Sequence, residues 1–124
     1  MELKNENNQN LEEKVQLHEV ATACSKTDGF GIIIEVHSDD YGIIGDETNP
    51  AHAHIKTTDG EYLGKFSITI QPPKNIENII DCDKNAIIPT KYKQIIIKWS
   101  QSKNEYGGLE WSFLKFCWRA LHPD

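Results

Sequence analysis

The chain has 124 residues and a formal net charge of −6, with 38% hydrophobic and 26% charged residues. This length fits one domain, and the composition is that of a soluble globular protein. No apolar run approaches the roughly 20 residues that span a bilayer, and the polar N-terminus does not look like a secretory signal. We therefore expect a cytoplasmic protein that does not enter a membrane.

Charge is distributed unevenly along the chain. Residues 1–90 hold 16 acidic and 7 basic residues, which gives −9, whereas residues 91–124 hold 3 and 6, which gives +3. An acidic body argues against nucleic-acid binding, because the sequence-independent part of that affinity comes from neutralising phosphates. The three cysteines are odd in number and widely spaced, so neither a disulfide framework nor a cysteine zinc site is expected.

The elements follow in order along the chain. Residues 1–10 are polar and predict a disordered tail, and residues 11–124 predict a single domain. Asp-Gly pairs at 28–29 and 59–60 are typical of tight hairpin turns. Pro72 and Pro73 end the last strand, since neither has a backbone N–H to donate. The β-branched or alternating segments predicted to be strands are 15–23, 30–37, 51–57 and 62–70.

Two helices are predicted at the C-terminal end, after an irregular connection over residues 74–89. Thr90 is the expected N-cap of the first, in which Tyr92 and Trp99 fall on one face with Ile95 and Ile96. The second covers 109–121 and has a wide apolar face. One side of it comprises Leu109, Phe113, Phe116, Cys117 and Ala120, and it is extended by Trp111, Leu114, Trp118 and Leu121. Strands followed by helices predict an α+β fold, with a mostly antiparallel sheet of three to four strands and both helices packed on one face.

The segment Asn49-Pro50-Ala51-His52-Ala53-His54-Ile55 is the first candidate for chemistry. Side chains at i and i+2 of a strand point the same way, so His52 and His54 should share one face of the sheet. The alanines and the isoleucine should occupy the other face. Paired imidazoles titrate near neutral pH and are common metal ligands, which is why this pair calls for an explanation.

One interpretation is a divalent metal site for Zn, Mn or Ni. A catalytic zinc takes about three protein ligands and keeps one position open. His37 ends the preceding strand, and the aspartates of the following loop, Asp39, Asp40 and Asp46, can each supply a third ligand. The ligand candidates named on this basis are His52, His54, His37 and Asp46.

Two other interpretations stay open. His52 and His54 can act as acid and base in a metal-free phosphoesterase or nuclease, with Lys56 on the same face stabilising a phosphate. Alternatively, both histidines are half-buried polar groups that only pin the Asn-Pro turn through hydrogen bonds. The sequence does not decide among the three.

The last predicted helix raises a separate question, because its aromatic residues suit either the domain core or a protein partner. Tryptophan and arginine are enriched at the energetic centres of interfaces. On that ground Trp111, Trp118 and Arg119 are the candidates for binding a partner. Core packing is the competing interpretation for the two tryptophans.

With these elements placed, residues 30–120 resemble a small bacterial family of domains of unknown function. The residues that carry the resemblance are Asp46 and the Asn49-Pro50 pair, then His52 and His54, followed by Gly64-Lys65-Phe66, Pro89, Lys93 and the three tryptophans. Members often sit in gene pairs similar to toxin–antitoxin loci or on mobile elements. The resemblance implies a small accessory or interaction protein of such a locus, acting by protein binding. A phosphoesterase that uses His52 and His54 is the alternative.

Overall fold

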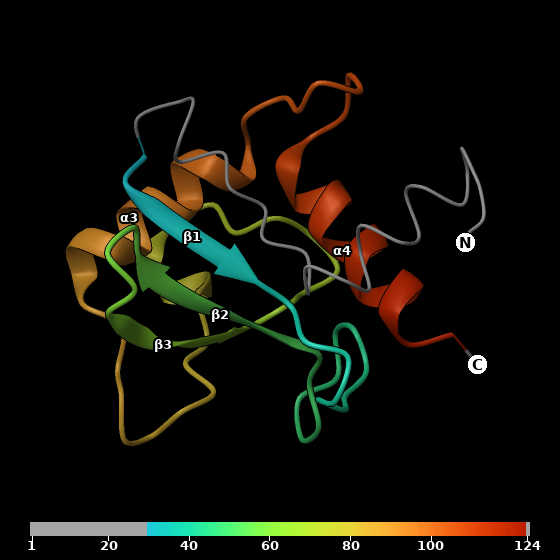
Figure 1. Ribbon diagram of the computed structural model, residues 1–124, viewed down its shortest axis with the longest axis horizontal. Coiled ribbons are helices and arrows are strands. Elements are labelled where there is room, and N and C mark those ends of the chain that lie inside the picture. Colours follow the sequence, from blue (N-terminus) through green and yellow to red (C-terminus); the bar gives the residue numbers. More distant parts are fainter. Residues whose placement is uncertain (1–29, 124) are drawn as a thin grey trace.

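The computed structural model describes residues 30–123, whose elements follow in the order β1, β2, β3, η1, α3 and α4 (Figure 1). These form an α+β fold with a three-stranded antiparallel sheet and two C-terminal helices, which confirms the predicted fold class. The expected tail at 1–10, the expected strand at 15–23 and Cys24 lie outside the described residues.

The sheet is built from β1 (Ile32–Glu35), β2 (His52–Thr57) and β3 (Tyr62–Ser67), with β2 in the centre. Each strand is shorter than its predicted segment. β3 ends at Ser67. The Ile68 N–H still donates to the Ala51 carbonyl at 2.8 Å, but the next two carbonyls are bound by α4. The Trp111 indole N–H donates to the Thr69 carbonyl at 2.9 Å, and the Lys115 ammonium donates to the Ile70 carbonyl at 2.7 Å.

The connection predicted as irregular adds a short edge to the sheet. After the 3-10 turn η1 (Ile76–Asn78), the Ser67 N–H donates to the Ile80 carbonyl, and the Cys82 N–H donates to the Lys65 carbonyl, both at 2.9 Å. Between them, Asp81 forms an isolated antiparallel bridge with Phe66. Residues 80–82 therefore lie beside β3 as a strand too short to count as an element.

Gly64 in β3 permits this close approach. Its φ of +145° is a conformation that side chains other than glycine rarely adopt. A Cβ atom at this position would lie 2.6 Å from the Ala86 carbonyl oxygen and 2.8 Å from the Ile88 side chain. The chain after residue 82 thus packs directly on the backbone of β3.

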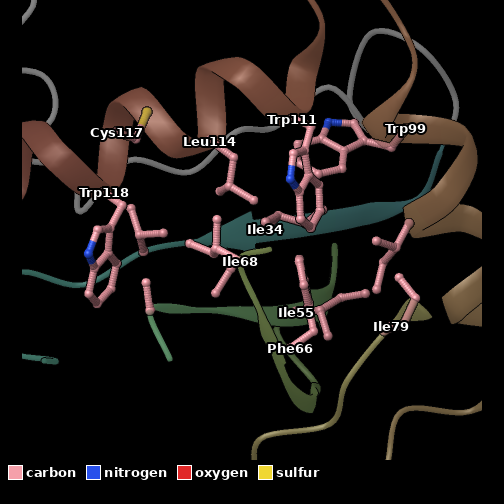
Figure 2. Packing of buried hydrophobic residues seen from close by; sticks show 14 of the residues in the cluster. Ile34, Ile55, Phe66, Ile68, Ile79, Trp99, Trp111, Leu114, Cys117 and Trp118 are labelled. Atoms are coloured by element: carbon pink, nitrogen blue, oxygen red, sulfur yellow. The ribbon is translucent and has the colours of Figure 1, made fainter. Parts of the chain in front are cut away.

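The core lies between the inner face of the sheet and the helices α3 (Thr90–Ser100) and α4 (Glu110–Leu121) (Figure 2). Trp111 packs there against Phe66 and Trp99, with ring centroids 5.8 Å and 6.3 Å apart. The predicted face of α3 is confirmed, since Ile96 and Trp99 are fully buried. Within residues 30–123, no helix is both long and apolar enough to cross a membrane.

Two details of the helices differ from the prediction. Pro89 occupies the N-cap position of α3, so Thr90 is the first helical residue and makes no capping hydrogen bond. On α4, Phe116 is 42% exposed and Phe113 only partly buried. The part of the predicted apolar face that packs on the sheet is the row that begins at Trp111 and recurs every three or four residues. That row comprises Trp111, Leu114, Trp118 and Leu121, with Cys117 beside it.

Candidate metal site on the outer face of the sheet

The two histidines of β2 share the outer face of the sheet, as predicted. Ala51, Ala53 and Ile55 are fully buried on the inner face, whereas the side chains of His52 and His54 are 14% and 16% exposed. This alternation follows from the strand geometry. The two histidines therefore lie on a partly exposed surface of the sheet and not in the core.

Asp40, from the loop between β1 and β2, reaches over both histidines. Its Oδ2 atom accepts a hydrogen bond from His54 Nε2 at 2.9 Å and lies 3.1 Å from His52 Nε2. The loop aspartate that meets the histidines is therefore Asp40. Asp46 caps its own turn instead, accepting hydrogen bonds from the Asn49 N–H at 2.7 Å and the Thr48 hydroxyl at 3.1 Å. The structure does not bring Asp46 to the histidine pair.

His52 contacts Asp40 without forming a hydrogen bond to it. Its Nδ1 lies 3.2 Å from the Pro50 carbonyl, which can only accept, so Nδ1 carries the proton. In the neutral ring, the Nε2 lone pair then faces a carboxylate oxygen, and this buried nitrogen has no hydrogen-bond partner among residues 30–123. A proton or a metal ion in this position would relieve the repulsion between the two acceptors.

His37 completes the cluster from the end of β1. The register pairs Glu35 with His54, so the residue two positions beyond Glu35 passes beside the imidazole. The rings of His37 and His54 stack with centroids 4.0 Å apart and 18° between their planes. His37 Nε2 also lies 3.2 Å from Glu35 Oε1.

His37, Asp40 and His54 together form a group that could hold a metal ion. Each offers one ligand atom, these atoms all lie within 4.8 Å of one another, and all three residues are partly buried. Two imidazole nitrogens and one carboxylate oxygen are a donor set that suits zinc and other transition metals. His52, predicted as a ligand, lies at the border of this group through its contact with Asp40.

The protonation states of the group match what a metal needs. Burial raises the pKa of Asp40, but the hydrogen bond from His54 and the nearby imidazoles outweigh it, so the pKa is lowered from 3.8. Burial lowers the pKa of His54 below 6.5, with the neighbouring histidines adding to the effect and Asp40 opposing it. At neutral pH the carboxylate is ionised and His54 is neutral, and these are the forms that bind metals.

Lys56, the predicted phosphate-stabilising residue, is engaged elsewhere. Its ammonium lies 2.9 Å from Glu35 Oε2, and the exposed fractions of the two side chains are 33% and 17%. Burial raises the pKa of Glu35, yet its hydrogen bonds with Lys56 and His37 leave it lowered overall. Lys56 thus balances a carboxylate on the same face.

Sequence reasoning missed the β3 side of this face. Lys65 lies directly opposite His54 in the register of β2 and β3. The Tyr62 hydroxyl donates to Asp83 Oδ2 at 2.7 Å, and burial with this hydrogen bond raises the pKa of Tyr62. The alternation of β3 does signal an outward Lys65, but its position beside His54 depends on the hairpin register and the bulge next to Ile55.

The predicted partner-binding residues separate into two environments. Trp111 and Trp118 are 1% and 4% exposed and belong to the core, so the prediction that they form a partner surface is wrong. Their indole rings lie on the α4 row that faces the sheet, which explains the burial. Arg119 is exposed.

Comparisons of the chain with protein-family models, with curated proteins and with solved structures gave no match. The site is therefore interpreted from its own geometry.

Proposed function

We propose that this protein binds a divalent transition-metal ion, best fitted by Zn²⁺, through His37, Asp40 and His54. The observation that carries the proposal is the convergence of their three ligand atoms within 4.8 Å on a half-covered surface. Neutral His54 and ionised Asp40 need not lose a proton when the ion binds. His52, whose Nε2 lies 3.1 Å from Asp40 Oδ2, borders this group but is not one of its three ligands.

Three protein ligands leave room at a zinc ion for water or a substrate, as in catalytic rather than structural sites. Such an ion supplies a Lewis acid and an activated water, the chemistry of metal-dependent phosphoester hydrolysis. This is the enzymatic alternative raised by the sequence, with Asp40 in the place of Asp46 and without a direct role for Lys56.

The test is a zinc titration of the metal-free protein, followed by desalting and elemental mass spectrometry. The wild type should retain near-stoichiometric zinc, and His54→Gln and His37→Gln should each lose most of it. His122→Gln is the matched control, since His122 ends α4 and stacks on Trp118 rather than on the cluster. Equal zinc retention by His54→Gln and the control would overturn the proposal.

A second candidate, suggested by the resemblance to accessory proteins of toxin–antitoxin-like loci, is protein binding through the outer side of α4. Tyr106 is 68% exposed and Phe116 42% exposed, and Phe113 lies between them with centroids 6.1 Å from each. Exposed aromatic rows of this kind favour interfaces, and the exposed Arg119 lies on the same helix.

The measurement for this candidate is co-purification of a stoichiometric partner from the native host. Phe116→Ser should lose that partner. Ile87→Ser, which changes an isoleucine that is 59% exposed outside α4, should keep it. Retention of the partner by both variants would count against this surface.

A further inference from the structure

Lys65 differs from two nearby lysines, Lys56 and Lys93, in making no ion pair within the described part of the chain. Lys56 pairs with Glu35 at 2.9 Å and Lys93 pairs with Asp81 at 2.7 Å. Among residues 30–123, no ion pair involves Lys65, although its side chain is partly buried. A partly buried ammonium that makes no ion pair can take an anionic ligand as its direct partner.

The position of Lys65 ties it to the metal cluster. It is the cross-strand neighbour of His54, and directly opposite side chains on one face have Cβ atoms roughly 5 Å apart. A lysine side chain has the length to reach over the adjacent imidazole. An ion held by His54 would therefore lie within reach of the Lys65 ammonium.

The other titratable groups near Lys65 are either neutral or already hydrogen-bonded. Asp83 accepts from the Tyr62 hydroxyl at 2.7 Å and from the Asn85 N–H at 2.9 Å. The thiol of Cys82 is kept protonated, because burial raises its pKa. Tyr62 likewise stays a neutral phenol. Of the two described lysines on this face, Lys56 and Lys65, Lys65 is therefore the one available to a ligand.

Charge balance makes the anion site depend on the metal. Without an ion, Asp40 and Asp83 outnumber Lys65, and the surface repels anions. A divalent ion overcompensates the single carboxylate among its ligands, so the face becomes positive at the point where Lys65 reaches. An anion with two oxygens can then contact the ion and the ammonium together.

We propose, resting on the metal site above, that the metal-loaded protein binds a phosphate group, with one oxygen on the ion and another on Lys65. The group can belong to free phosphate or to a phosphate monoester. In either case the ammonium on β3 and the ligand cluster of β1, β2 and their connecting loop form a single two-point anion site.

The test uses protein loaded with Co²⁺, whose visible absorption reports changes in the metal's ligands. Inorganic phosphate and phenyl phosphate are titrated separately, which distinguishes the free ion from a monoester. Either probe should alter the spectrum of the wild type. Lys65→Gln should keep the same cobalt stoichiometry but bind the probe about tenfold more weakly, a difference of about 1.4 kcal/mol. Lys65→Arg should restore most of the affinity.

Lys103→Gln, in the exposed connection between α3 and α4, is the matched control and should bind the probe as the wild type does. If no spectrum of bound cobalt is seen, the proposed metal site itself is wrong. A cobalt spectrum that neither phosphate nor phenyl phosphate alters would overturn the anion site alone. Equal probe affinities of Lys65→Gln and Lys103→Gln would overturn the role of Lys65.

Discussion

Asp40→Asn is the substitution that probes the centre of the site with the least change in shape. Asp40 holds the loop between β1 and β2 over the outer face through His54 at 2.9 Å and His52 at 3.1 Å. The asparagine oxygen can still accept a hydrogen bond from His54 Nε2. The substitution therefore removes only the extra strength that a charged acceptor gives to this hydrogen bond.

The expected loss of stability follows from the burial of the His54–Asp40 pair. The side chains of His54 and Asp40 are 16% and 23% exposed, so solvent screens their contact only in part. A hydrogen bond to a charged group contributes roughly twice as much as a neutral one, so the free energy of unfolding should fall by about 1 kcal/mol at pH 8. For a domain of this size that is a fall of about 4 °C in the melting temperature.

Lower pH should enlarge the effect. The pKa of His54 is below 6.5 in the folded protein, so the unfolded chain takes up the proton first as pH falls. The contribution of neutral His54 to the free energy of unfolding is therefore fully present above pH 6.5 and is lost as the pH falls below that value. Asp40 raises the pKa of His54, so its replacement lowers that pKa further and steepens the loss. The stability difference between the variant and the wild type should therefore grow as the pH falls below 6.5, because only the wild type keeps a carboxylate that favours the protonated imidazole.

The assay is urea denaturation of metal-free protein, with a chelator present, at pH 8 and pH 5.5. Asp39→Asn serves as the control, because Asp39 is exposed and immediately precedes Asp40. Equal stability of the two variants at both pH values, or a deficit that does not grow at pH 5.5, would refute the assigned role of Asp40.

Two further substitutions test how the short edge is held on β3. Gly64→Ala should destabilise the fold by about 3 kcal/mol, since φ is +145° and the new Cβ would meet the Ala86 carbonyl; thermal unfolding that matches wild type would contradict this. Asp81→Ala should cost about 3 kcal/mol in denaturant unfolding, because it leaves the Lys93 ammonium and the Ile88 N–H without their acceptor. Lys93→Met in the same background should recover part of the loss, and no recovery would mean that the pair is uncoupled.

The strands and helices of this fold could be predicted because the spacing of apolar residues along the chain determines them. Alternation puts His52 and His54 on one face of β2, and the helical row of Ile96 and Trp99 defines the buried side of α3. Where two rows compete, as on α4, the sequence alone does not select the face. Docking on the sheet buries the Trp111 row and leaves Phe116 at the surface.

The remainder of the site depends on contacts between distant residues. Asp39, Asp40 and Asp46 are equivalent from composition, and only the path of the connecting loop brings Asp40 to the histidines. The neighbour of His54 on β3 follows from the hairpin register and its bulge rather than from residue type. For the same reason the engagement of Lys56 by Glu35 has no signal in sequence.

X-ray absorption at the zinc edge of the zinc-loaded protein tests the assigned metal site most directly. His37, Asp40 and His54 predict nitrogen and oxygen ligands at about 2.0–2.1 Å, the outer-shell scattering of two imidazoles, and no sulfur. The fraction of zinc that His54→Gln still binds at excess zinc should show one imidazole contribution fewer than the wild type. A sulfur ligand at about 2.3 Å, or a spectrum unchanged by His54→Gln, would contradict the site.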